Sequence, residues 1–227
     1  MKLNKLTVLT VSGLGCAATL GAMYLVTAGS GTAPAGTNAG PAAPLVAPER
    51  IENVGVAGSD VLYPTAIEGT VGAKKMKLVL TGTALRKKVL FNVYTIGCYV
   101  QEGIAVSSPD DLCSKDCGKQ LHLVMERAVT GAQMAEAFHD AIRQNYPKPA
   151  FDKEIAALSQ KLRALELVKG DQVWLTTVPE VGLTISVVGK ATIAIDSPAF
   201  AKAMWEVYLG KKNIGEPIKA GLVSRLK

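Results

Sequence analysis

The chain has 227 residues, of which 25 are basic and 19 acidic, so its formal net charge is +6. The basic residues are scattered and aromatic residues make up only 5% of the chain, so it lacks the basic, aromatic-rich stripe of a nucleic-acid-binding protein. The sequence also contains no internal repeat, no glycine-rich phosphate loop and no GxSxG motif. These observations exclude nucleic acid as a partner and argue against nucleotide-binding and serine-hydrolase functions.

Residues 1–26 predict an export segment. Lys2 and Lys5 precede an uncharged run over 6–26, which as a helix of about 1.5 Å per residue would span roughly 30 Å of hydrocarbon. That length favours an uncleaved membrane anchor, whereas Val26-Thr27-Ala28 suits cleavage of a signal peptide. Cys16 gives a weaker indication of a lipoprotein site. We expect the folded domain to lie outside the cytoplasm, either periplasmic or anchored to the membrane through this segment.

Residues 27–48 predict a flexible linker. They consist almost entirely of Ala, Gly, Pro, Thr and Ser, carry no charge and offer little to bury. No acidic residue occurs before Glu49, so we place the domain boundary between Pro48 and Glu49. The remaining segment, 49–227, is long enough for a single domain with a sizeable core.

The stretch 78–100 is rich in β-forming residues and has one arginine, Arg86, near its middle. Gly82 and the basic cluster 86–88 predict a hairpin bend between two strands. A guanidinium is always charged and is seldom left in apolar surroundings without an acidic or polar partner. Arg86 is therefore either a solvated turn residue or the anion-holding group of a pocket.

Two cysteines, Cys113 and Cys117, fall in a predicted polar loop over 107–119. Outside the cytoplasm a small disulfide between them is plausible if the turn brings their Cβ atoms within reach. Free thiols are one alternative. A metal site that also uses His122 is another, but no fourth ligand is evident. We otherwise expect His122 to be a structural or surface residue, and the sequence indicates no resident cofactor.

The rest of the chain predicts an α+β domain. Thr130 begins a helix as its N-cap and Gln133 completes a capping box; Ser197 followed by Pro198 begins another helix, which Gly210 ends. We expect an antiparallel sheet with helices packed on one face. The predicted strands cover 120–126, 171–178, 183–188 and 191–195, and the predicted helices cover 130–146, 151–165, 197–210 and 216–226.

Five motifs in this order resemble the chalcone isomerase-like family. They are GTALRKK, VYTIGCYV, TGAQMAEAFHDAI, GDQVWLTTVPEVGLTISVVG and SPAFAKAMWEVYLGKK, and the resemblance covers about 61–227. It implies an open-faced β-sandwich, in which a large curved antiparallel sheet is covered by helices that enclose an apolar pocket.

The resemblance implies two alternative sites. In the plant enzymes of the family an arginine, matched by Arg86, stabilises the phenolate during flavanone ring closure. This chain has Met134, Ala141 and Tyr94 where the plant enzymes have polar residues, so efficient isomerisation is not expected. Fatty-acid-binding members hold a carboxylate with an arginine and a tyrosine, which Arg86 and Tyr94 resemble, and Met134 and Phe138 would line the apolar part.

We therefore expect a module that binds an apolar carboxylic acid, with Arg86, Tyr94, Met134 and Phe138 as ligand-binding residues. One alternative is an intramolecular lyase acting on a phenolic or enone substrate, with Arg86 as its catalytic residue. Another is a scaffold protein without a pocket. The hairpin of this chain is shorter than the plant one, so Arg86 and Tyr94 need not converge, and Tyr94 could equally be a plain core aromatic residue.

Overall fold

The computed structural model describes residues 52–226. The predicted export segment 1–26, the linker 27–48 and the boundary between Pro48 and Glu49 lie outside the described residues. The strands are β1 (Asn53–Gly55), β2 (Leu62–Pro64), β3 (Ala66–Val71), β4 (Lys74–Lys88), β5 (Phe91–Gln101), β6 (Lys119–Met125), β7 (Val129–Thr130), β8 (Glu166–Leu167), β9 (Gln172–Val178), β10 (Gly182–Val187) and β11 (Ala191–Ile195). The helices are α1 (Pro109–Ser114), α2 (Gly131–Asn145), α3 (Asp152–Leu162), α4 (Pro198–Leu209) and α5 (Glu216–Leu222).

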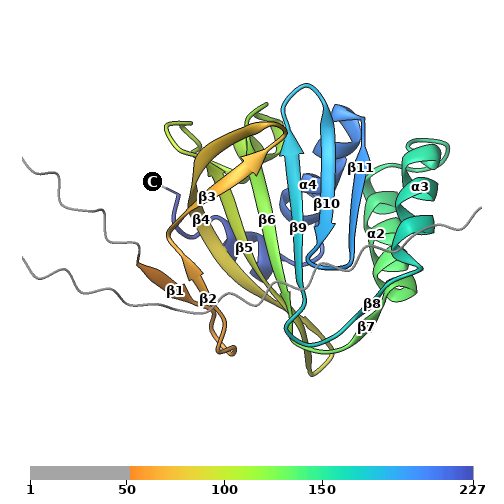
Figure 1. The fold of residues 1–227 in the computed structure, drawn as a ribbon, viewed down its shortest axis with the longest axis horizontal. Coiled ribbons are helices and arrows are strands. Elements are labelled where there is room, and N and C mark those ends of the chain that lie inside the picture. The colour runs from red at the N-terminus through yellow and green to blue at the C-terminus, as the bar shows by residue number, and fades with distance from the viewer. Residues whose placement is uncertain (1–51, 227) are drawn as a thin grey trace, which may run out of the picture. The chain divides into compact units, whose positions relative to one another are not determined.

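Seven strands form one antiparallel sheet in the order β11-β10-β9-β6-β5-β4-β3, and the sheet is curved (Figure 1). Helix α4 packs against β9 and β10, and α5 packs against β4 and β5. Helix α2 packs on α3 and α4, and α1 packs on α4. The predicted fold class, an antiparallel sheet covered by helices, is confirmed. Among residues 52–226, no helix is long and apolar enough to cross a membrane.

The two faces of the sheet carry separate hydrophobic clusters. The larger cluster joins the sheet to the helices, and Ile96 and Phe200 are both fully buried in it. The smaller cluster contains Tyr63 of β2 together with Leu80 and Tyr99 of the sheet. Because successive side chains of a strand point to opposite faces, the central strand β5 is buried on both sides.

A β-bulge in β4 decides which face receives Arg86. The register between β4 and β5 shifts by one residue between Leu80 and Gly82. Leu80 and Leu85 consequently belong to the smaller cluster on the β1–β2 side, whereas Ala84 belongs to the helix-side cluster. Without the extra residue, alternation would place Arg86 on the same face as Leu80. With it, Arg86 faces the helices.

The hairpin predicted in this stretch is formed by β4 and β5, but the predicted position of its turn, at Gly82 and the basic cluster 86–88, is wrong. Strand β4 continues from Lys74 to Lys88, and the chain turns at 89–90. Gly82 has a different role: its φ is +157°, and a Cβ there would lie 2.1 Å from the carbonyl oxygen of Gly221 in α5. A glycine is therefore required because the backbone of α5 packs directly against the bulge.

Most of the later elements agree with the sequence-based prediction. The capping box at the start of α2 is formed as predicted, with Thr130 and Gln133 bonding each other's backbone. Ser197 caps α4, Pro198 is its first residue and Gly210 ends it. The predicted meander corresponds to β9, β10 and β11. Helix α5 ends earlier than predicted, and β1, β2, β3 and α1 had not been predicted at all.

Helix α1 occupies the segment predicted to be a polar loop. Ser108 caps it, and its two apolar residues, Leu112 and Cys113, are buried. Cys113 and Cys117 are free thiols, so the predicted disulfide is not formed in this structure. Helix α1 places Cys113 in the buried helix-side cluster, which also contains Cys117. Oxidation of the pair stays a prediction.

The structure does not bring His122 to these cysteines. Cys113 and Cys117 lie in the helix-side cluster. His122 instead stacks on Trp174, with ring centroids 3.7 Å apart, and contacts Tyr63 of the small hairpin β1–β2. Within residues 52–226, no group of three or more potential metal ligands is found.

Candidate functional site

Three neighbouring strands place one row of side chains on the helix-covered face. Arg86 of β4 lies directly opposite Tyr94 of β5, and Tyr94 lies directly opposite Met125 of β6. Directly opposed residues of an antiparallel pair project from the same face with Cβ atoms about 4.5–5.5 Å apart. The row Arg86, Tyr94 and Met125 therefore forms a continuous floor, and all three residues line the same cavity.

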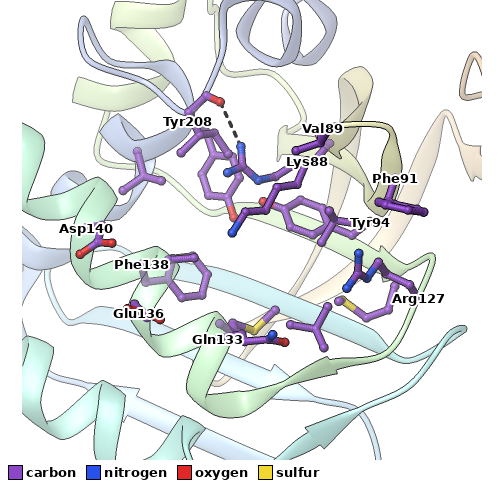
Figure 2. A pocket seen from close by; sticks show the side chains of 18 residues that line it. Lys88, Val89, Phe91, Tyr94, Arg127, Gln133, Glu136, Phe138, Asp140 and Tyr208 are labelled. Carbon is purple, nitrogen blue, oxygen red and sulfur yellow. Dashed lines mark hydrogen bonds between the residues drawn. The ribbon is translucent and has the colours of Figure 1, made fainter.

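The cavity over this floor has a volume of about 670 Å³ (Figure 2). Helix α2 forms one wall, the end of α4 another, and the β4–β5 turn lies at its mouth. The lining includes the apolar residues Val89, Phe91, Val93, Met125, Val129, Met134, Ala137, Phe138, Val207 and Ile214, and the polar or charged residues Arg86, Lys88, Tyr94, Arg127, Gln133, Glu136, Asp140 and Tyr208.

The four ligand-binding residues predicted from the sequence, Arg86, Tyr94, Met134 and Phe138, all line this one cavity. The shorter hairpin does not keep Arg86 and Tyr94 apart. Arg86 is partly buried within a strand, so it is not the exposed turn residue of the alternative interpretation. Their role in binding a ligand stays a prediction.

Arg86 is held by a backbone carbonyl. Its Nη1 donates a hydrogen bond of 3.0 Å to the carbonyl oxygen of Ile214, in the connection between α4 and α5, drawn as the dashed line in Figure 2. A guanidinium has five N–H donors, and this bond uses one of them. Among the described residues no carboxylate forms an ion pair with Arg86. The side chain is thus positioned at the cavity with most of its donor capacity unused.

Tyr94 and Tyr208 bring two hydroxyls next to Arg86. Burial raises the pKa of Tyr94, while the positive charge of Arg86 and a side-chain hydrogen bond with Tyr208 lower it. Burial also raises the pKa of Tyr208 well above its ordinary value, and the proximity of Tyr94 adds to this. Both hydroxyls therefore stay protonated at neutral pH. Together with Arg86 they form a cationic group flanked by two neutral hydroxyls.

The mouth of the cavity is more polar than the sequence suggested. Ala141, which replaces a polar residue of the plant enzymes, is not among the lining residues, and α2 contributes Gln133, Glu136 and Asp140 (Figure 2). Because Gln133 and Glu136 are exposed, the cavity opens to solvent along this edge of α2. The acidic residues of α2 face Lys88, which belongs to the opposite side of the mouth.

Tyr208 is the main cavity residue that the sequence analysis did not identify. It lies in the predicted helix 197–210 and has 1% of its surface exposed. Helix α4 is buried on most of its surface, so its sequence offers no periodic signal that separates cavity-lining positions from core positions. Only the fold shows that Tyr208 of α4 lies next to Tyr94 of β5.

His122, on the opposite face of the sheet, makes stability depend on pH. Burial lowers its pKa from 6.5 to about 4, partly offset by the hydrogen bond with Gln172, and its Nδ1 is buried without a partner. Above pH 6.5 both folded and unfolded states are neutral at this residue. As the pH falls from 6.5 towards 4, only the unfolded state binds the proton, so the free energy of unfolding decreases.

We expect His122→Phe to flatten this decrease between pH 6.5 and 4, measured by urea unfolding at several pH values. Phenylalanine retains the stacking on Trp174 but cannot take up a proton. The matched control is His139→Phe on the surface of α2, which should leave the pH dependence attributable to His122 in place. A nuclear magnetic resonance titration in which His122 protonates near pH 6.5 would contradict the prediction.

Comparisons with known proteins support the fold. Residues 62–224 match the family model described as chalcone isomerase-like. A comparison with curated protein sequences gives no match. Among solved structures, the chain is similar to a fatty-acid binding protein of Arabidopsis thaliana, with a TM-score of 0.58 and 15% sequence identity over 77% of this chain and 95% of that one. At that identity the likeness shows the fold alone. Since the family model spans most of the sequence, the chain belongs to the chalcone isomerase-like family.

Proposed function

We propose that this protein binds an apolar carboxylic acid, such as a fatty acid, in the cavity between the sheet and α2. The observation that carries the proposal is the position of Arg86, a permanent cation on the floor of the cavity, fixed by Ile214 and without a carboxylate partner among the described residues. Placing a charge in partly desolvated surroundings is costly unless it is paired. A ligand carboxylate would supply the missing partner.

The neighbouring hydroxyls suit the same chemistry. A carboxylate can accept several hydrogen bonds, and bonds between charged groups are shorter and stronger than neutral ones. Arg86 could donate to it from the guanidinium, and the protonated hydroxyl of Tyr94 or Tyr208 could donate a second bond. Met125, Met134 and Phe138 would then contact the hydrocarbon part of the ligand.

The size of the cavity agrees with this class of ligand. Small-molecule sites usually have volumes of roughly 300–1,000 Å³ and a mainly apolar lining with a few polar groups that fix orientation. At about 670 Å³ the cavity is within that range. The structural likeness to the fatty-acid binding protein of Arabidopsis thaliana supports the same proposal.

The test is to purify the full-length protein, extract it with organic solvent and identify bound molecules by mass spectrometry. Co-purified fatty acid, removable and then restored by titration of one equivalent, would support the proposal. Turnover of a chalcone without fatty-acid binding would favour the intramolecular lyase alternative with Arg86 as the catalytic residue. Neither binding nor turnover would favour the scaffold alternative.

We expect Tyr94→Phe and Tyr208→Phe each to weaken binding of a medium-chain fatty acid by about 2- to 12-fold. Each change removes one hydroxyl that could donate to the carboxylate and leaves the ring in place. We expect a net loss of only about 0.5–1.5 kcal/mol, because the remaining tyrosine hydroxyl can still donate. Isothermal titration measures the affinities. The matched control is Tyr99→Phe: the hydroxyl of Tyr99 donates to the carbonyl oxygen of Pro64 on the other face of the sheet, so its loss should leave affinity unchanged. An effect as large in the control as in the two cavity tyrosines would contradict the assignment.

A further inference from the structure

The turn between β4 and β5 exposes three large apolar side chains in succession. Val89, Leu90 and Phe91, which we call the apolar tip, have 86%, 87% and 64% of their surface exposed. Isolated exposed apolar residues are common on protein surfaces and need no explanation. Three consecutive exposed apolar residues at the end of a projecting hairpin do need an explanation, because all three side chains are in contact with water at the same place.

The backbone of the apolar tip is also unusual. Val89 has a φ of +58°, a left-handed conformation that tight hairpin turns normally reserve for Gly or Asn. A β-branched residue in that conformation is a genuine outlier, and such strain tends to be retained where a functional requirement overrides it. Local turn chemistry therefore does not account for valine at this position.

Positive charge surrounds the apolar tip. Lys87 and Lys88 immediately precede it and are exposed. Arg127 follows β6 by two residues, and its guanidinium lies over the ring of Phe91, 5.8 Å from the ring centroid. No ion pair that involves Lys87, Lys88 or Arg127 is recorded among residues 52–226. Three cations thus flank the apolar tip, while the acidic residues at the mouth, Glu136 and Asp140, belong to α2 on its other side. An apolar projection flanked by cations is complementary to a surface that is negatively charged outside and apolar beneath.

The apolar tip also borders the cavity. Val89 and Phe91 line its mouth together with Lys88 and Arg127 (Figure 2). Figure 1 shows the β4–β5 turn at the same end of the sheet as the β8–β9 connection, where the exposed Val168 is followed by Lys169. An exposed apolar residue next to a basic residue therefore occurs twice at the end of the sheet where the cavity opens, in the apolar tip and in the β8–β9 connection.

From these observations we propose that the apolar tip is a membrane-docking site that inserts Val89, Leu90 and Phe91 into the surface of an anionic lipid bilayer. Peripheral insertion combines burial of apolar side chains with attraction of Lys and Arg to anionic headgroups. A protein partner fits less well, since three side chains on a convex turn offer far less than the roughly 800 Å² per partner of a stable interface. Docking would place the mouth of the cavity against the lipid. The proposal does not rest on the identity of the cavity ligand.

The test places a tryptophan at the tip of the full-length chain. Leu90→Trp is mixed with vesicles that contain brominated lipid, and the fluorescence of the parent chain, with its own Trp174 and Trp205, is subtracted. We expect strong quenching with phosphatidylglycerol–phosphatidylcholine vesicles and little with phosphatidylcholine alone. Replacing Lys87 or Lys88 by alanine in the Leu90→Trp background should reduce the ratio of quenched to unquenched fluorescence about fivefold for each lysine.

The matched control is Val181→Trp. Val181 is 51% exposed in the turn between β9 and β10, at the opposite end of the sheet (Figure 1). The Val181→Trp chain has the same N-terminal segment as the Leu90→Trp chain, so any membrane binding through residues 1–26 affects both variants alike. Equal quenching of the two variants, or none of Leu90→Trp on anionic vesicles, would overturn the proposal. A concentration-dependent fluorescence change of Leu90→Trp without vesicles would instead indicate a second copy of the chain as the occupant, and would overturn it too.

Discussion

Arg86→Ala should weaken binding of a medium-chain fatty acid by about 10- to 150-fold. The substitution removes a charge-assisted hydrogen bond worth about 1.5–3 kcal/mol, and each 1.4 kcal/mol corresponds to a factor of ten. The structure adds a reason to expect so large an effect: the bond from Arg86 to Ile214 fixes the guanidinium beforehand, so little further ordering is needed when a ligand binds. Isothermal titration of the parent and variant chains measures the difference.

Two comparisons separate this effect from general damage. Lys87→Ala removes the same charge one residue further along β4, but Lys87 does not line the cavity, so affinity for the soluble ligand should stay the same. Arg86→Lys keeps the charge without the planar fork of donors and should give an intermediate affinity. The free energy of unfolding of Arg86→Ala should change by less than about 1 kcal/mol, because the carbonyl of Ile214 loses its donor while a partly desolvated cation is removed. Unchanged affinity in Arg86→Ala would remove the carboxylate-binding proposal.

The sequence predicted those elements whose signals are local. The capping box at Thr130, the Ser197-Pro198 start of α4 and the turns of the β9–β11 meander each depend on a few consecutive residues. The same kind of signal was present but not used at Ser108-Pro109, which begins α1 in the same way that Ser197-Pro198 begins α4. Because most residues of that segment are polar, it was predicted to be a loop, and the burial of Leu112 and Cys113 was not predicted.

The bulge at Gly82 could not be predicted locally. A glycine next to a basic cluster is typical of a hairpin bend, and only the backbone of α5, far along the sequence, makes glycine necessary within a continuous strand. The apolar pattern does change phase there, from Leu78 and Leu80 to Leu85, but this is recognisable only once β4 is known to continue. Since the phase change sets the direction of Arg86, the most important feature of the site depends on a tertiary contact.

The pairing of Arg86 with Tyr94 was predicted from resemblance, whereas Tyr208 and Ile214 come from elements that follow more than a hundred residues later. Their contribution depends on how α4 ends and how the chain continues into α5, because Ile214 presents a backbone carbonyl rather than a side chain. A backbone acceptor leaves no trace in residue type. The candidate site was therefore predictable in its two strand residues and its two α2 residues, and not in the groups that hold and flank them.

The largest loss of stability should follow Trp205→Ala, with the free energy of unfolding reduced by about 3–5 kcal/mol. Trp205 is 1% exposed, its Nε1 donates a 2.6 Å hydrogen bond to Thr177, and its ring lies 5.0 Å from Nζ of the buried Lys119. Truncation would leave a large cavity at the junction of α4, β9 and β6, a buried hydroxyl without its donor, and an ammonium without its aromatic neighbour. Burial already lowers the pKa of Lys119, so its charge is sensitive to any lost stabilisation.

Urea unfolding of three variants checks this account. Trp205→Phe keeps an aromatic ring and should cost about 1–3 kcal/mol, mainly for the unsatisfied Thr177 hydroxyl. Trp174→Ala removes the same residue type from the other face of the sheet, where it is only partly buried, and should cost less than Trp205→Ala. Because a domain of this size is stable by only about 5–15 kcal/mol, Trp205→Ala should lose between about a fifth and all of that stability. A loss of under about 1 kcal/mol in Trp205→Ala would contradict the importance assigned to the packing of α4 against β9 and β10.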